Sequence, residues 1–184
     1  NASVYIYHNI VKLLQEWLFV QTAAADPRVR GMNIPEDLLG ECISYVVSHE
    51  VGHCLGLMHN MAGSSSIPVD SLRCPEFTQK YGTTHSIMDY ARFNFVAQPG
   101  DMEKGVSLMP PTLGKYDYYV IDWLYRPILS AATAEDEVPV LRKFIIDHSS
   151  DPAYRYGKQQ TRAKVDPSAF DEDLGDDPVK AAQY

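Results

Sequence analysis

The stretch from His49 to His59, which reads HEVGHCLGLMH, constrains this chain more than any other part of its sequence. Residues four apart lie on one face of an α-helix, separated by about one turn of rise. His49 and His53 can therefore aim a ring nitrogen at the same point in space. This spacing predicts a helix whose two histidines hold a metal ion, at the Zn–N distance of about 2.0–2.1 Å.

Three further residues of this stretch refine the prediction. Glu50 follows the first histidine, so its carboxylate flanks the metal position and can reach a metal-bound water instead of the metal. Gly56 can adopt a positive φ and end the helix sharply, which lets His59 approach from a direction that the helix does not offer. Three neutral imidazoles leave a fourth position for water, which is the arrangement of a catalytic zinc site and not of a closed structural one.

The complete pattern resembles the extended zinc-binding motif of the metzincins, the clan of zinc metallopeptidases that contains astacins, serralysins, matrixins and adamalysins. The residues that carry this resemblance, with no departure from the motif, are His49, Glu50, His53, Gly56 and His59. The resemblance implies a zinc cofactor held by the three histidines, with Glu50 as the general base.

A second feature of the metzincins is a methionine-bearing turn beneath the metal, and residues 86–90 (Ser-Ile-Met-Asp-Tyr) resemble it. The resemblance implies that Met88 forms an apolar, polarizable floor under the imidazoles without binding the metal. In astacins and serralysins, a tyrosine two residues after the methionine binds zinc or stabilises the oxyanion. The match implies that Tyr90 is a phenolic donor to the tetrahedral intermediate, with a packed core tyrosine as the alternative.

Asn60, which follows the third histidine, differs from the Glu, Pro, Ser or Asp that the four named families carry there. The wider sequence resembles a bacterial family of large, uncharacterised metzincin-like zinc proteins. The stretches that carry this likeness are residues 19–23, 26–28, 69–72, 88–94 and 173–178. The likeness implies export to the cell envelope or beyond, on a longer chain whose remaining domains would be partners of this one.

Apolar periodicity and cap residues predict a mostly helical chain. The expected helices cover residues 9–25, Pro35 through the metal motif, 75–81 up to Gly82, 115–125, and Thr133 through His148. Asp177-Pro178 has the signature of one more helix start. In contrast, Ala2–Tyr7 is rich in β-branched and aromatic residues, which predicts a strand.

We therefore predict an α-rich α+β fold of the metzincin-like (zincin) type. A metzincin domain places a mixed sheet before the active-site helix, and the edge strand of that sheet binds substrate. Only 48 residues precede His49, so part of this N-terminal sheet is expected to be missing. Residues 1–130 are predicted to form the zinc protease core with its Met-turn. Residues 131–184 are predicted to be a helical and irregular extension of the same domain, truncated at its end.

The charge balance excludes some partners. There are 16 Lys+Arg against 24 Asp+Glu, a net charge of −8, whereas nucleic acids and anionic membranes require a concentrated basic face. The sequence contains no uninterrupted apolar run of membrane-spanning length, so we expect no membrane insertion. The acidic run 171–177 is predicted to be a solvated segment, and a set of calcium ligands is the less favoured interpretation.

Two residues near the Met-turn are weaker candidates. His85 precedes the turn, where a surface or hydrogen-bonded histidine is favoured over one that approaches the metal or the substrate. Arg92 can meet a substrate carboxylate or pair with an acid, and the sequence does not separate these roles. The aromatic stretch 116–125 is predicted to be core.

The function that we expect is zinc-dependent hydrolysis of peptide bonds by a secreted or envelope metalloendopeptidase, with a protein or peptide as substrate. One alternative is a catalytically inactive, zinc-binding metzincin module for protein interaction. Another is zinc-dependent hydrolysis of a non-peptide bond. Glu50 favours catalysis, because a purely structural zinc site does not require a carboxylate at that position.

Overall fold

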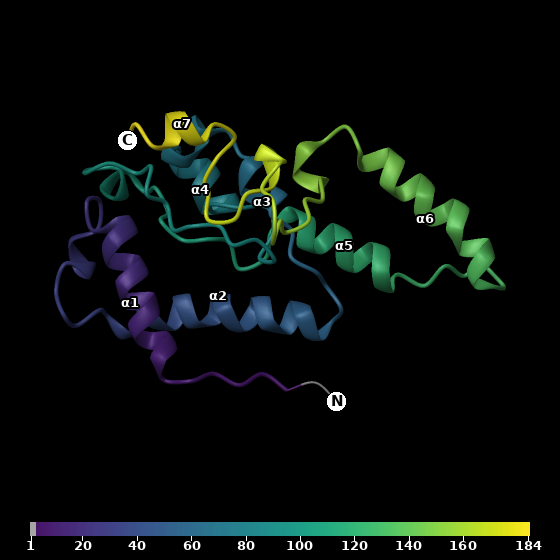
Figure 1. Cartoon of the computed structure of the whole chain (residues 1–184), viewed down its shortest axis with the longest axis horizontal. Coiled ribbons are helices and arrows are strands. Elements are labelled where there is room, and N and C mark those ends of the chain that lie inside the picture. Colours follow the sequence, from purple (N-terminus) through teal and green to yellow (C-terminus); the bar gives the residue numbers. More distant parts are fainter. Residues whose placement is uncertain (1–2) are drawn as a thin grey trace.

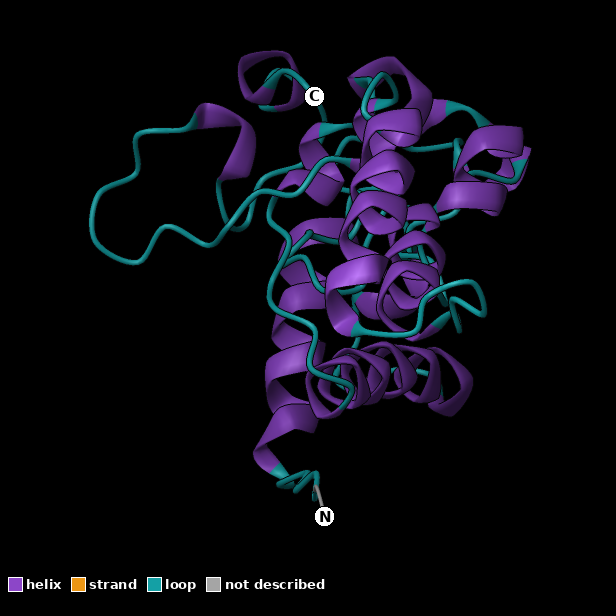
Figure 2. Cartoon of the chain, turned by 90° about the vertical axis from the view of Figure 1, so that its right-hand side faces the viewer, coloured by secondary structure: helices purple, strands orange, loops and turns teal. Residues whose placement is uncertain are grey.

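The computed structural model describes residues 3–184 as helices joined by long irregular segments (Figures 1 and 2). The α-helices are α1 (Asn9–Thr22), α2 (Glu36–Cys54), α3 (Ala62–Ser65), α4 (Pro75–Tyr81), α5 (Lys115–Tyr125), α6 (Ala134–His148) and α7 (Pro178–Ala181). Short 3-10 turns are η1 (Pro27–Val29), η2 (Val69–Arg73), η3 (Met102–Lys104), η4 (Pro152–Tyr154) and η5 (Pro167–Ala169). The α-rich part of the predicted fold is confirmed.

Most helix ends lie where the cap residues predict them. Helix α2 begins directly after Pro35, and α4 ends at Gly82, which has a φ of +61°. The Thr133 hydroxyl accepts a hydrogen bond from the Asp136 N–H and so caps α6. Helix α1 is shorter than predicted, since it ends at Thr22.

The early end of α1 has a specific cause. The guanidinium of Arg30 donates hydrogen bonds to Ala23 O at 2.7 Å and to Ala24 O at 3.0 Å. Along a longer helix these carbonyls would lack donors, because Pro27 has no N–H and the Arg28 N–H is bonded to Asp26 Oδ1, and the Arg30 guanidinium satisfies them instead. The chain therefore turns before Asp26 and enters η1.

The predicted N-terminal strand is wrong for the residues that can be compared. Residues 3–7, here called the N-terminal segment, are not part of a strand. Ala2, the first residue of the predicted strand, lies outside the described residues. A strand requires a hydrogen-bonded neighbour, and residues 3–184 contain no strand that could pair with this segment. The β part of the predicted α+β class is therefore absent from the described residues.

The first core cluster lies where α1 crosses α2, a crossing that is visible in Figure 1. Its buried members are Leu14, Leu18, Val29, Leu38, Cys42, Phe93 and Met109. Burial of each large aliphatic side chain contributes about 1.5–3 kcal/mol. This cluster holds the first half of α2, whereas the last turns of the same helix, which carry the metal motif, pack against a separate buried cluster that contains Met88.

A second cluster ties the end of the chain to its middle. Leu174 and Ala181 pack with buried residues of the 67–96 region, which are Ile67, Val69, Leu72 and Val96. In Figure 1, the yellow end of the chain lies over α3 and α4. Residues 155–176, here called the C-terminal segment, include much of the acidic run that the sequence predicts to be solvated.

Two acids of that run are bonded to the body of the molecule instead. Asp173 Oδ1 accepts a hydrogen bond from the Ser64 hydroxyl at 2.9 Å. Asp176 Oδ1 accepts one from the Val69 N–H at 3.0 Å. The prediction of a solvated segment is therefore wrong at Asp173, which is half-buried beside the buried Leu174, whereas Asp176 remains exposed.

Helix α6 lies at the edge of the molecule and buries none of its residues completely (Figure 1). It is attached mainly through aromatic contacts, in which the ring of Tyr119 stacks on Phe144 with a centroid distance of 5.2 Å. No described helix combines the length and the apolarity that a membrane span requires.

Candidate metal centre

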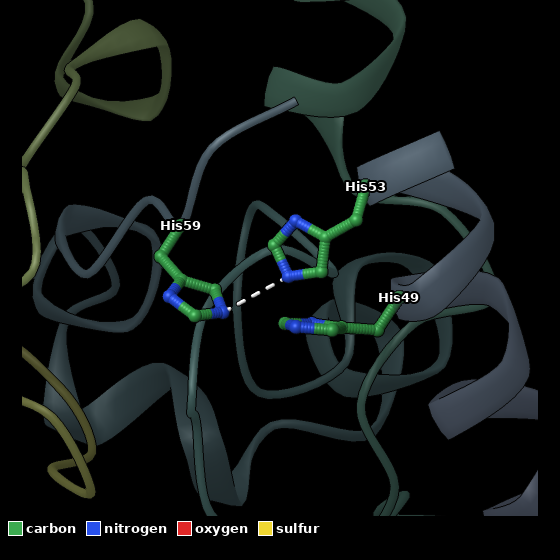
Figure 3. Close-up of side chains that lie close together, drawn as sticks. All are labelled: His49, His53 and His59. Carbon is green, nitrogen blue, oxygen red and sulfur yellow. Dashed lines mark hydrogen bonds between the residues drawn. The ribbon is translucent and has the colours of Figure 1, made fainter. Parts of the chain in front are cut away.

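Three histidines converge at the end of α2. His49 and His53 project from the helix, and His59 approaches from the following loop (Figure 3). One ring nitrogen from each lies within 4.8 Å of the other two. His49 is buried, whereas the other two are half-buried. The structure therefore brings together the three residues that the sequence predicts to bind the metal.

Gly56 makes this convergence possible. Its φ is +86°, a left-handed conformation that residues with a Cβ rarely adopt. The Leu57 N–H donates to Gly52 O at 3.0 Å, so the helix closes here and the chain reverses. The predicted helix-ending role of Gly56 is confirmed.

The proton positions on the three rings are fixed by their neighbours. Each ring places Nδ1 next to an oxygen that can only accept a hydrogen bond, so each Nδ1 carries a proton. The pairs are His49 with Ile87 O at 2.6 Å, His53 with Leu57 O at 2.9 Å, and His59 with Gln159 Oε1 at 2.9 Å. In the neutral rings, every Nε2 is therefore left with a free lone pair, as a metal ligand requires.

The geometry of these Nε2 atoms fits a cation. The Nε2 atoms of His53 and His59 lie 3.0 Å apart (Figure 3), and two lone pairs at this distance repel each other unless a proton or a cation is shared. Two nitrogens bound to one tetrahedral zinc lie about 3.3–3.4 Å apart. Burial, the largest cause, lowers the pKa of His49, which favours the neutral ring that a metal binds.

The Met-turn lies directly under the helix. Met88 is completely buried, and its Sδ would lie 2.4 Å from a Cβ added at Gly52. Gly52 is one residue before His53, so the methionine packs against the same part of α2 that carries the ligands. The Asn60 N–H donates to Met88 O at 2.9 Å and joins the turn to the residue that follows His59.

The Met-turn is anchored from α5 by a buried carboxylate. Asp117 accepts hydrogen bonds from the Ser86 hydroxyl at 2.8 Å and from the Ile87 N–H at 2.9 Å. It also accepts from the Gly114 N–H at 2.6 Å. Because Ile87 O accepts from His49, Asp117 supports a ligand through one intermediate residue. The sequence analysis predicts this helix only as aromatic core. An acid inside such an apolar stretch is the sequence signal that could have indicated a buried, hydrogen-bonded carboxylate.

Tyr90 and Glu50 lie on the open side of the histidines. The Tyr90 ring is 4.5 Å from the His59 ring and 5.6 Å from the His49 ring, measured between centroids. Burial and the negative charge of Glu50 raise the pKa of Tyr90, so its phenol stays protonated and can donate a hydrogen bond.

Glu50 lines two hollows of the surface. One, of about 570 Å³, lies between the N-terminal segment and α2 and is also lined by His53. The other, of about 320 Å³, is lined by His49, Tyr90 and Trp17. A substrate that occupies either hollow would therefore meet the carboxylate of Glu50 beside the histidines.

The structure also places the two weaker candidates. Arg92 forms an ion pair with Glu172 at 2.5 Å and lies over the Trp17 ring at 4.8 Å. Of the two roles that the sequence left open for Arg92, the structure shows the pairing with an acid. His85 is neither on the surface nor hydrogen-bonded. It is buried beside Phe77, its Nδ1 has no described partner, and burial lowers its pKa to about 4.

Two further residues at the centre were missed by sequence reasoning. Asn60 was noted only for its difference from known families, yet its side chain is fully buried and hydrogen-bonded. Gln159 contacts His59 across 100 positions of sequence. Local spacing carries no signal for a contact of this range.

A family model described as Met-zincin matches residues 31–184, which is most of the chain and includes all three histidines. No curated protein and no solved structure matches the sequence.

Proposed function

The chain belongs to the Met-zincin family, and from that premise we propose that it is a zinc-dependent metalloendopeptidase. The observation that carries the proposal is the arrangement of the three imidazoles. Each Nδ1–H is held by an acceptor, which leaves Nε2 of His49, His53 and His59 available to a metal, and one ring nitrogen from each lies within 4.8 Å of the other two. Glu50 lines hollows together with His49 and His53, which supports assigning it the role of general base.

Zinc bound by the three Nε2 atoms would polarise the scissile carbonyl and lower the pKa of a coordinated water. The carboxylate of Glu50 then accepts a proton from the attacking water and delivers it to the nitrogen of the leaving amine. Glu50 has no ion-pair partner among the described residues. Its carboxylate is therefore free to exchange protons with the substrate.

Tyr90 supports the charge that develops on the carbonyl oxygen. Its raised pKa keeps the phenolic proton in place, so the O–H can donate to the oxyanion. The ring packs against two of the three imidazoles, which restricts the phenol to the open side of the site. Such a donor stabilises the transition state more than the bound substrate, because the negative charge on the carbonyl oxygen develops only as the transition state is approached.

The test is Glu50→Gln, which keeps the size of the side chain and removes its ability to accept the proton. We expect about one zinc per chain by elemental analysis, and a fall in kcat on a peptide library of about 10²–10⁴-fold. His59→Ala is the reference for zinc loss. Turnover in Glu50→Gln at the wild-type rate would contradict the mechanism. Zinc binding by a wild-type chain that leaves the whole library intact would favour the inactive binding module instead.

A further inference from the structure

The third ligand differs from the other two in how it is oriented. The Nδ1–H groups of His49 and His53 donate to backbone carbonyls of Ile87 and Leu57. The Nδ1–H of His59 donates to a side chain, that of Gln159, at 2.9 Å. This is a hydrogen bond between residues 100 positions apart, and it joins the candidate metal centre to the C-terminal segment.

Gln159 is brought to His59 by the residue that follows the ligand. The side chain of Asn60 donates from Nδ2 to Arg155 O at 3.0 Å and accepts at Oδ1 from the Gly157 N–H at 2.8 Å. In addition, the Met61 N–H donates to Gly157 O at 2.7 Å. Three hydrogen bonds therefore fix the backbone two to four residues before Gln159.

The close approach of the C-terminal segment to the residues after His59 also depends on Gly157. A Cβ at this position would lie 2.8 Å from the Cβ atoms of both Ala62 and Ala169, a distance that side chains do not adopt. Gly157 itself is buried. The C-terminal segment is thus seated tightly on the turn that carries His59, and its position is not one that a loosely attached tail would hold.

We propose that Gln159 is a positioning residue for the third metal ligand, delivered to it by Asn60 and the docked C-terminal segment. The inference rests on the proposed function, because it assumes that His59 binds zinc. Gln159 Oε1 can only accept, so it keeps the proton on Nδ1 and the lone pair on Nε2. Without this partner, the ring of His59 can turn, and the proton can move to the nitrogen that must bind the metal.

The same contacts couple metal binding to docking of the segment. Any ligand that binds only the arrangement with the segment docked also stabilises that arrangement. Zinc should therefore slow amide exchange at Gly157, whose N–H is bonded to Asn60. The reverse also holds, because the coupling between two equilibria is reciprocal.

The test compares three substitutions in the full chain by zinc competition against a chromophoric chelator. Gln159→Leu removes the acceptor, and we expect its zinc Kd to rise about 10–100-fold. Gln159→Glu keeps an acceptor and should restore binding to within about threefold of wild type. Gln160→Leu is the matched control, since the Gln160 side chain bonds only within the 160–169 loop and does not reach His59.

A second readout separates orientation from general loss of structure. With cobalt in place of zinc, the visible absorption bands of Gln159→Leu should shift, while those of Gln160→Leu should match wild type. In a His59→Ala background, Gln159→Leu should cause no further loss of zinc affinity, since the two residues act as one unit.

The inference is overturned if Gln159→Leu binds zinc as wild type does, or if Gln160→Leu loses as much affinity. A wild-type chain that binds no zinc at neutral pH would overturn both this inference and the proposed function. A chain that binds zinc with the expected Gln159 dependence but cleaves no peptide would leave this inference standing and remove only the proposed function.

Discussion

The N-terminal segment (residues 3–7) and the C-terminal segment (residues 155–176) are two largely irregular stretches that each reach the candidate metal centre. The first lines a hollow with Glu50 and His53, but its side chains are exposed, with Tyr5 at 76%. The second is seated on the turn after His59 through hydrogen bonds and a buried Leu174. Both segments lie near the site, but only the C-terminal segment is hydrogen-bonded to one of the three histidines.

The difference shows what holds irregular chain in place. Backbone N–H and C=O groups outside helices and sheets need partners if they are to be buried. The C-terminal segment finds them on polar side chains of the folded body, among them Asn60 and Ser65, which donate to Arg155 O and Ser168 O. Among the described residues, none donates such a bond to residues 3–6. Secondary structure alone does not show that one segment is held more firmly than the other, because both are largely irregular.

The largest expected effect is that of Asn60→Leu. The change removes the acceptor for the N–H groups of Gly157 and Ala62 inside a buried site. Each unsatisfied buried group costs about 1–3 kcal/mol, so the free energy of unfolding should fall by about 3 kcal/mol or more. Denaturant titration measures this loss, and zinc affinity should fall with it.

Asn33 offers a matched control for that substitution, because it is an exposed asparagine. Asn33→Leu should change the free energy of unfolding by less than about 0.5 kcal/mol. If the two variants were equally stable, Asn60 would not be what holds the C-terminal segment, and the contrast between the two segments would lose its physical basis.

A smaller effect is expected from Asp173, which lies in the C-terminal segment. Burial, the largest cause, raises its pKa to about 6. An acid with a raised pKa in the folded state binds its proton more tightly there than in the unfolded chain. Its contribution to stability is complete below the unfolded pKa of about 3.9 and is lost as the pH rises through about 6.

Asp173→Asn should therefore flatten this dependence. Between about pH 4 and pH 7.5, the wild type should lose about 1–2 kcal/mol more than the variant, after allowance for the partial exposure of Asp173. Urea unfolding of the metal-free protein at several pH values measures the difference. Identical slopes for both proteins would show that Asp173 ionises as freely in the docked segment as in the unfolded chain.

The smallest effect is expected in the N-terminal segment. Tyr5→Ser removes a mostly exposed aromatic ring, so the free energy of unfolding should change by less than about 0.5 kcal/mol. Thermal unfolding provides the measurement. A loss above about 1 kcal/mol would show that this segment is held as firmly as residues 155–176, and the comparison would fail.

Prediction from sequence succeeded where the controlling interactions are local. The start of α2 after Pro35, the end of α4 at Gly82 and the cap of α6 by Thr133 all follow from residues within one turn of the boundary. It failed where a partner elsewhere decides the outcome. Residues 3–7 have the composition of a strand but no described strand beside them, and α1 ends at Thr22, where the more distant Arg30 bonds the carbonyls of Ala23 and Ala24.

At the metal centre, the sequence by itself determined that His49, His53 and His59 can converge. Two of them lie one helical turn apart, and Gly56 reverses the chain toward the third. These relations depend on backbone geometry over a few residues. Only the tertiary structure decided what orients the rings of His49 and His59, because their partners come from distant parts of the chain, whereas His53 bonds to the nearby Leu57 O.

Asp117 and Gln159 are examples of residues that orient the ligands from distant parts of the chain. Asp117 fixes the turn that holds His49, and Gln159 accepts a hydrogen bond from the Nδ1–H of His59. Neither occupies a position that local spacing could relate to a ligand, since packing of α5 and docking of residues 155–176 bring them there. Local backbone geometry thus set which residues can bind a metal, whereas long-range packing set how the rings of His49 and His59 are oriented.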